Sequence, residues 1–350
     1  MTPVDDISTL FVNRRLEESI SDFFSKAGAC TTRIQCDAFA NKTFGGPVEP
    51  VPFQGVYSYT VAAANGSVIV QFRELDSPLD TQMLVTIQNI HPDFVASCSF
   101  HGTIGLSPAL LIYAMNMLPG DNYFKLSLLN QDLDHRLATV RSLARFFAQS
   151  WKNSSPSDPS TMSELLEDCY SSFGYISSNL PTRFQETISQ VQGVLPTLFS
   201  GGYPLVITHG DLSEMNILAN PRTGEITGII DWAEAGIQPF GFALYALDNI
   251  LGYLTPNGWG FHDTAEDLQD EFWRVFYKLV GGVSGSEMEL MRHARLAGLF
   301  LRYGIPHRSG RKGVVGVGGA MNTSIYVLDA LIPAFKTAHV TTQEGHAESK

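Results

Sequence analysis

Residues 206–218 read VITHGDLSEMNIL and residues 229–232 read IIDW. Apolar residues lead into and out of the polar loop, as is typical of short strands. Between them lie Asp211, an amide five residues later at Asn216, and a second carboxylate fifteen residues after that at Asp231. Phosphoryl transfer needs one carboxylate to orient and deprotonate an attacking hydroxyl, and oxygen ligands to hold Mg²⁺ on nucleotide phosphates. The pattern is therefore typical of a site that handles nucleotide phosphates.

The spacing predicts that these three side chains meet. A five-residue loop lets Asp211 and Asn216 face one cavity, and a hairpin through residues 220–225 returns Asp231 to the same place. The competing interpretation is an ordinary loop and turn. Four fixed positions occupied by His, Gly, Asp and Asn make chance a poor explanation.

HGDxxxxN followed by IDW resembles the catalytic and metal-binding motifs of the aminoglycoside phosphotransferase and choline kinase family. The longer pattern HGDLSEMNIL…ITGIIDWAEA…PFG is similar to the fungal branch of that family. The resemblance implies that Asp211 is the catalytic base and that Asn216 and Asp231 hold Mg²⁺. It implies that His209, the other member of the catalytic set, braces the loop.

Two N-terminal stretches extend the resemblance. Residues 54–61, QGVYSYTV, are similar to the family's phosphate loop, which makes Gly55 and Ser58 candidates for cofactor binding. The loop 54–58 has one glycine instead of three, and the competing interpretation is a plain turn. Residues 115–120, MNMLPG, are similar to its hinge, which implies that backbone groups of Met115 and Met117 seat the adenine. ATP and Mg²⁺ are the cofactors that the resemblance implies.

The nucleotide-binding half departs from the kinase pattern. A kinase-like N-lobe offers a Lys from its third strand, held by a Glu of the next helix. Here Gln71 occupies the lysine position, and Arg73 lies on the same face of the strand. Arg73 either reaches the phosphates, which a guanidinium binds well, or is a solvated strand residue. The following helix, residues 79–90, contains no Glu, so the ion pair is absent or rebuilt.

The order of patterns predicts an α+β, bilobal, protein-kinase-like fold. Strands at 56–61 and 68–73, joined by a turn around 64–66, form an antiparallel hairpin, and 110–115 forms a further strand. Helices are predicted at 16–27, from 77 to 90, and from about 137 onward at 137–151, 161–176, 182–199, 240–253, 264–280 and 286–304. We expect an N-lobe at 1–114 with an extra N-terminal helix, a hinge at 115–120, a helical C-lobe at 121–338 and a flexible tail at 339–350.

Composition limits the partners. The chain has 350 residues and a net charge of −12, which argues against a nucleic-acid partner and would suit a cationic small molecule. No apolar run approaches the ~20 residues of a membrane span, so we expect a cytoplasmic protein without a membrane partner. The four cysteines form no CxxC pair, and reduced thiols are the simplest interpretation. Glu234 and Asp248 are candidates to face a substrate amine or guanidine; alternatively, Glu234 caps a helix start.

These observations support three hypotheses. The leading one is an ATP- and Mg²⁺-dependent phosphotransferase that acts on a hydroxyl of a small molecule. The second is a kinase-fold enzyme repurposed for other chemistry in secondary metabolism, as the missing Lys and Glu suggest. The third is a non-catalytic module that binds a nucleotide or small molecule. Nucleotide use separates the three.

Overall fold

The computed structural model describes residues 3–26, 31–129, 132–154, 158–255, 258–305 and 325–333. The chain divides into two compact units, Met1–Pro119 and Gly120–Lys350. This boundary falls inside the stretch 115–120 in which the sequence predicts the connection. The tail predicted at 339–350 and Cys30 lie outside the described residues. Cys36, Cys98 and Cys169 are free thiols.

The first unit contains a five-stranded antiparallel sheet with the order β1-β2-β3-β5-β4. Its strands are β1 (Glu49–Pro50), β2 (Ser58–Ala63), β3 (Val68–Glu74), β4 (Cys98–Ile104) and β5 (Leu110–Asn116). The predicted hairpin is confirmed: β2 pairs with β3 through a turn in which Asn65 has φ 56° and Gly66 has φ 82°. The sequence did not predict β4, a mostly exposed edge strand interrupted by an irregularity between Phe100 and Thr103. Such a strand lacks the apolar alternation on which prediction depends.

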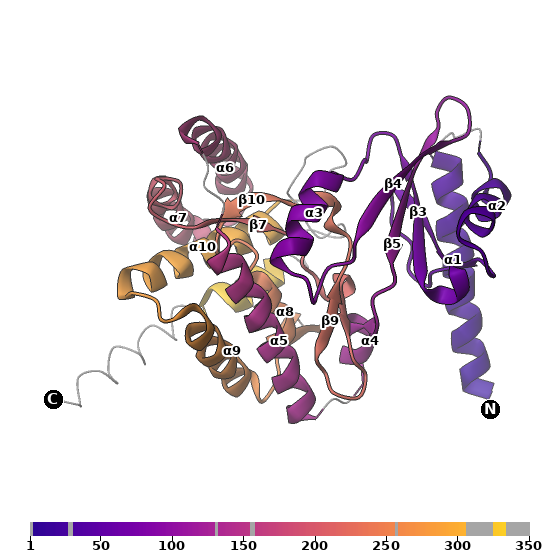
Figure 1. Cartoon of the computed structure of the whole chain (residues 1–350). Coiled ribbons are helices and arrows are strands. Elements are labelled where there is room, and N and C mark those ends of the chain that lie inside the picture. The colour runs from indigo at the N-terminus through magenta and orange to yellow at the C-terminus, as the bar shows by residue number, and fades with distance from the viewer. Residues whose placement is uncertain are drawn as a thin grey trace. The chain divides into compact units, whose positions relative to one another are not determined.

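Helices cover both faces of this sheet (Figure 1). α1 (Pro3–Lys26) and α2 (Arg33–Phe44) lie on one face, and α3 (Thr81–Ile90) lies on the other. Ile20 and Phe23 of α1 are buried in the same core as Val70 and Phe72 of β3. Because side chains alternate along a strand, Gln71 and Arg73 point away from this core.

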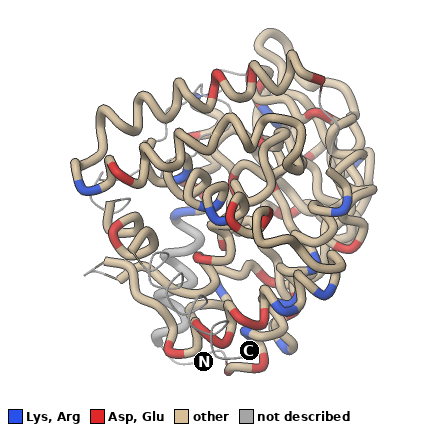
Figure 2. The backbone as a smooth tube through the Cα atoms, turned by 90° about the vertical axis from the view of Figure 1, so that its left-hand side faces the viewer, with Lys and Arg blue, Asp and Glu red and all other residues tan. Residues whose placement is uncertain are grey.

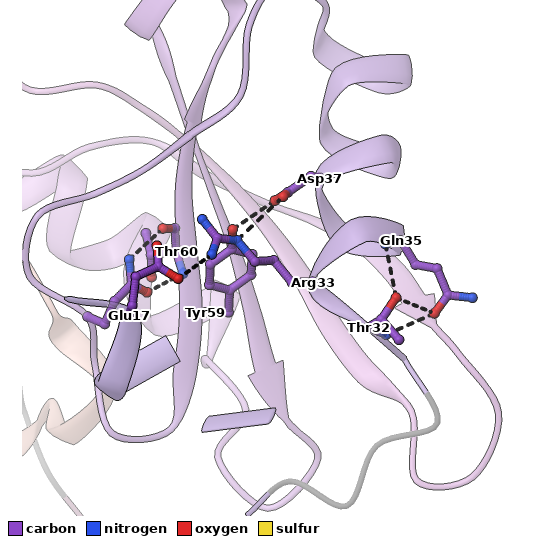
Figure 3. Close-up of polar contacts among 8 residues, drawn as sticks. Glu17, Thr32, Arg33, Gln35, Asp37, Tyr59 and Thr60 are labelled. Carbon is purple, nitrogen blue, oxygen red and sulfur yellow. Dashed lines mark hydrogen bonds and ion pairs between the residues drawn. The ribbon is translucent and has the colours of Figure 1, made fainter. Parts of the chain in front are cut away.

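A chain of polar contacts joins α1 and α2 to β2 (Figure 3). Arg33 donates to Glu17 at 2.7 Å and lies 3.7 Å from the carboxylate of Asp37. The hydroxyl of the buried Tyr59 donates to Asp37 at 2.8 Å. α2 itself was not predicted, because only Cys36 and Ala40 of its twelve residues are buried. Two small residues give a weak periodic signal.

The second unit is mainly helical. Its helices include α4 (Tyr123–Ser127), α5 (Leu133–Lys152), α6 (Pro159–Asn179), α7 (Gln185–Leu198), α8 (Tyr245–Leu251), α9 (Ala265–Val280) and α10 (Gly285–Tyr303), and residues 325–333 are also helical. Aromatic side chains fill the core between α5 and α9, where the rings of Phe147 and Phe272 lie 6.0 Å apart. The predicted helices are present, although α8 is shorter than expected because β11 begins at Gly252.

Short strands complete the second unit. β6 (Asp121–Asn122), β8 (Ile217–Ala219) and β9 (Ile226–Ile229) form one antiparallel sheet. β7 (Leu205–Thr208) pairs with β10 (Gly236–Pro239), and β11 (Gly252–Thr255) pairs with β12 (Gly258–Phe261). β7 and β8 are the strands predicted on either side of the polar loop. The predicted α+β fold class, with an antiparallel sheet followed by a larger helical unit, is therefore confirmed.

Lys and Arg are interspersed with Asp and Glu along the described backbone (Figure 2). In the part of the chain that the structure describes, no helix is both long and apolar enough to span a bilayer.

Candidate active site

The loop after β7 and the end of β9 are held together by backbone groups. The N–H of Ile230 donates to the carbonyl of Asn216 at 2.9 Å. The carbonyl of Ile230 accepts from Nε2 of His209 at 2.7 Å. Both polar backbone groups of the residue before Asp231 are thus bonded to the loop that carries Asp211. The structure therefore brings together the two sequence segments predicted to form the site.

His209 acts at the centre of this arrangement as a neutral brace. Its ring is fully buried and lies 4.5 Å from the ring of Trp232. Nδ1 accepts from the N–H of Asp211 at 3.3 Å, so Nε2 must carry the proton that it donates to Ile230. Burial lowers the pKa of His209. Its contacts position Asp211 and leave neither ring nitrogen for substrate.

Gly210 allows the loop to approach the second segment. It has φ 80°, and a Cβ there would collide with the backbone of Glu234 in the short helix η4 (Trp232–Glu234). Only glycine satisfies both the left-handed backbone and the close approach.

Tyr245 of α8 supports the loop from the other side, although it belongs to no recognisable sequence motif. Its hydroxyl donates to the carbonyl of Gly210 at 3.1 Å and accepts from the N–H of Leu212 at 3.0 Å. The two bonds bracket Asp211. A buried tyrosine needs a polar partner, but the partner's identity depends on the fold.

Asp211 is partly exposed and faces an arginine that sequence analysis did not select. Its side chain is 26% exposed, and Oδ1 lies 2.7 Å from Nη1 of Arg302 in α10. The contact is an ion pair without hydrogen-bond alignment, since neither atom has a hydrogen-bond partner among the described residues. Arg302 also lies over the ring of Tyr245, with 5.5 Å from guanidinium carbon to ring centre.

Asn216 and Asp231 offer oxygen ligands. Nδ2 of the buried Asn216 donates to the carbonyl of Asp211 at 2.8 Å, which leaves Oδ1 as its acceptor. Asp231 is exposed and has φ 62° and ψ 62°. Left-handed backbone in a residue other than glycine is uncommon and recurs at functional sites.

The donor set suits Mg²⁺ bound together with a nucleotide. Mg²⁺ takes oxygen ligands and is commonly held by one or two carboxylates plus substrate phosphates. Within the described ranges, no three His, Cys, Asp or Glu side chains form a metal-binding group, and a metal shared with phosphates needs none. The oxygens of Asn216 and Asp231 therefore fit the group.

The two predicted substrate carboxylates differ in position. Glu234 belongs to η4 and packs its backbone against Gly210, beside the loop. Asp248 is 1% exposed and accepts two hydrogen bonds from Arg295, from Nε at 3.0 Å and from Nη2. Its carboxylate is neutralised inside the unit, so the structure does not support the substrate role predicted for Asp248.

The predicted phosphate-binding residues of the first unit are committed to local contacts. Arg73 is 3% exposed and donates from Nε and Nη2 to Ser77, both at 2.7 Å, and from Nη1 to Gln71 at 3.1 Å. Gln71 and Arg73 share a face, as strand alternation predicted. The alternative of a solvated Arg73 is wrong, because the side chain is buried.

The other predicted cofactor groups are also engaged. Ser58 is 2% exposed, and its hydroxyl lies 3.5 Å from that of Thr60; Gly55 approaches it so closely that a Cβ would lie 2.8 Å from the Ser58 hydroxyl. Met115 of β5 pairs with Ile69 of β3 and with Cys98 of β4. The N–H of Met117 donates to the carbonyl of Ser67 at 2.9 Å. That donor, expected to meet adenine, is bonded instead to the turn that precedes β3.

A surface pocket of about 570 Å³ lies between α5 and α9 and is lined in part by Trp273 and Tyr277. It contains none of the residues predicted for the site.

The comparisons with known proteins agree with the motif. The model of the phosphotransferase enzyme family, APH, matches residues 91–247, a range that contains His209, Asp211, Asn216 and Asp231. The resemblance to the aminoglycoside phosphotransferase and choline kinase family is thereby confirmed. A search of curated proteins finds no significant match.

Solved structures of several such enzymes are similar to the chain. Aminoglycoside phosphotransferase APH(2'')-Ib, ADP-bound, is 17% identical, with a TM-score of 0.46 over 77% of this chain and 88% of that one. The GDP complex of wild-type aminoglycoside 2'-phosphotransferase-IIIa is 14% identical, with a TM-score of 0.46 over 78% and 91%. A choline/ethanolamine kinase family protein from Mesorhizobium loti is 13% identical, with a TM-score of 0.45 over 81% and 82%.

Proposed function

We propose that the protein is an ATP- and Mg²⁺-dependent phosphotransferase that acts on a hydroxyl of a small molecule. The observation that carries this proposal is the joining of Asp211, Asn216 and Asp231 through His209 and Ile230. Asp211 is the partly exposed carboxylate and is the group that orients the acceptor hydroxyl and takes its proton. Bound Mg²⁺ supplies charge neutralisation on the nucleotide phosphates, and Asn216 and Asp231 are the residues that hold it.

The acceptor must present its hydroxyl to Asp211, which lies beside the guanidinium group of Arg302. Arg302 lies 2.7 Å away, and Asp248 is neutralised by Arg295. Of the two carboxylates predicted to receive a cationic substrate, only Glu234 lies beside the loop. An acceptor with a positive group would therefore place it near Glu234.

The first test is the change in melting temperature when ATP and Mg²⁺ are added. A ligand that binds only the folded state stabilises it by about 2.7 kcal/mol at a hundredfold excess over Kd. We expect a rise in the wild type that requires Mg²⁺ and is absent in Asp231→Asn. Asparagine suits this test because it tolerates the left-handed backbone at least as well as aspartate.

The matched control is Asp270→Asn, which removes an exposed carboxylate of α9 and should leave the shift unchanged. A positive result leads to ATP-consumption assays with hydroxylated small molecules, amines among them. In those assays Asp211→Asn should lower turnover by roughly 10²–10⁴-fold.

A second candidate is a kinase-fold enzyme that catalyses a reaction other than phosphoryl transfer. It is favoured by the local hydrogen bonding of the residues of the first unit that were predicted to bind the nucleotide. Arg73 and the N–H of Met117 are both used in local hydrogen bonds. If millimolar ATP with Mg²⁺ does not change the melting temperature of the wild type, the phosphotransferase proposal fails and this candidate takes its place.

A further inference from the structure

Arg302 carries a guanidinium group from the last turn of α10 to the catalytic loop. Its side chain is only 9% exposed, although arginine side chains are seldom buried unless paired. Its Nη1 lies 2.7 Å from Oδ1 of Asp211. It lies outside the sequence motifs that predict the site and outside the range that the family model matches.

The guanidinium has donors to spare. Nε and Nη1 are buried without a hydrogen-bond partner among the described residues, and so is Oδ1 of Asp211. A buried charged donor without a hydrogen bond is costly, and a ligand that accepts from it removes this cost.

Arg295, on the same helix, forms an ion pair with Asp248 that serves as a comparison, because that pair has a purely structural role. It donates to both carboxylate oxygens of Asp248, which is 1% exposed. Arg302 makes no aligned bond with any described residue, and its partner Asp211 is 26% exposed. The Arg295 pair is closed, whereas the Arg302 pair leaves donors unused beside a carboxylate that is partly exposed.

We propose that Arg302 binds the phosphoryl group while it passes to the hydroxyl oriented by Asp211. This inference rests on the proposed function. The acceptor oxygen bonds to the γ-phosphorus, and the bond from that phosphorus to the β,γ-bridging oxygen breaks. Its electron pair leaves with ADP, and the hydroxyl proton goes to Asp211. Negative charge on the transferring oxygens is met by the planar guanidinium, which suits phosphate in two-pronged fashion.

The test uses ADP, Mg²⁺ and aluminium fluoride, which together mimic a phosphoryl group in transfer. Melting temperatures are measured for the full chain with ADP and Mg²⁺, then with fluoride and aluminium added. We expect aluminium fluoride to add a further rise in the wild type. Arg302→Gln should keep the ADP–Mg²⁺ shift and lose the increment, corresponding to a roughly 100-fold weaker complex. Arg292→Gln, on the same helix, should behave as the wild type.

The outcomes separate the two proposals. Equal increments in the wild type and Arg302→Gln overturn the role of Arg302 and leave the proposed function standing. A wild type that does not respond to ADP and Mg²⁺ overturns both. If Arg302→Gln does not fold, Arg302→Lys is measured instead. An affinity for aluminium fluoride at least tenfold below that of the wild type supports two-pronged binding by Arg302. An unchanged rise in melting temperature overturns it.

Discussion

At the scale of single residues, the site depends on groups that no motif assigns to chemistry. His209 is conspicuous in the sequence, yet both of its ring nitrogens bond to backbone. Arg302 contacts Asp211 directly but is far from it in sequence. The approach of the segments that carry Asp211, Asn216 and Asp231 could be predicted, because these residues lie within one loop and one hairpin. Arg302 could not, because its position depends on how α10 packs.

Gly210→Ala should destabilise the second unit by about 2–4 kcal/mol, because it combines a left-handed backbone with overlap of Cβ and the backbone of Glu234. Denaturant unfolding measures the change. Gly193→Ala is the matched control: it lies within α7, and its Cβ meets nothing within 4 Å. That control should stabilise by up to about 1 kcal/mol. Equal effects of the two variants would contradict the close approach at Gly210.

His209 should make stability depend on pH. Burial lowers its pKa from the usual 6.5, so the neutral ring is the form that the fold requires. The associated stability is fully present above pH 6.5 and is lost as the pH falls through the lowered pKa. Melting temperatures between pH 8 and pH 5 should fall more steeply for the wild type than for His209→Asn. Parallel profiles would show that the ring protonates without cost.

At the scale of elements, amphipathic helices and the tight hairpin were predictable, and polar or short elements were not. α5 and α9 bury continuous stripes of side chains, whereas α2 buries two small residues and β4 is mostly exposed. The engagement of Arg73 with Ser77 was likewise hidden, because it depends on the turn after β3. These features could not be predicted because they depend on tertiary contacts, which leave no periodic pattern in the sequence.

Tyr245 links α8 to the catalytic loop, so Tyr245→Phe should loosen that loop. The change removes an acceptor from the N–H of Leu212 and a donor from the carbonyl of Gly210. We expect a loss of about 1–3 kcal/mol in unfolding free energy and faster hydrogen exchange of the Leu212 amide. Tyr253→Phe, at a side chain 51% exposed, should change neither quantity. Unchanged exchange at Leu212 in Tyr245→Phe would contradict the linkage.

At the scale of the whole molecule, the chain combines two cores with a large excess of negative charge. Each unit contains its own set of buried residues, and the boundary falls between Pro119 and Gly120. The net charge is −12. Such an excess keeps a protein soluble but destabilises its compact state through self-repulsion.

Raising the salt concentration from 10 to 150 mM should therefore raise the melting temperature. Screening at 150 mM limits charge interactions to about 8 Å. A gain of about 1 kcal/mol corresponds to roughly 2–4 °C for a unit of this size. Sucrose at equal osmolality serves as the control for effects that are not electrostatic. A fall with salt would show that attractive pairs, such as Arg183 with Asp329, outweigh repulsion.

The hydrogen bonds that join Ile230 to Asn216 and His209 have a consequence for which residues of the loop can be substituted during evolution. The bonds run through main-chain atoms of Asn216 and Ile230, and every amino acid except proline supplies those atoms. Ser213 and Met215, which lie between Asp211 and Asn216, also bond through main-chain atoms, so an exchange of their side chains should not displace Asp211 or Asp231. New acceptor preferences can be selected around a reaction centre that stays in place.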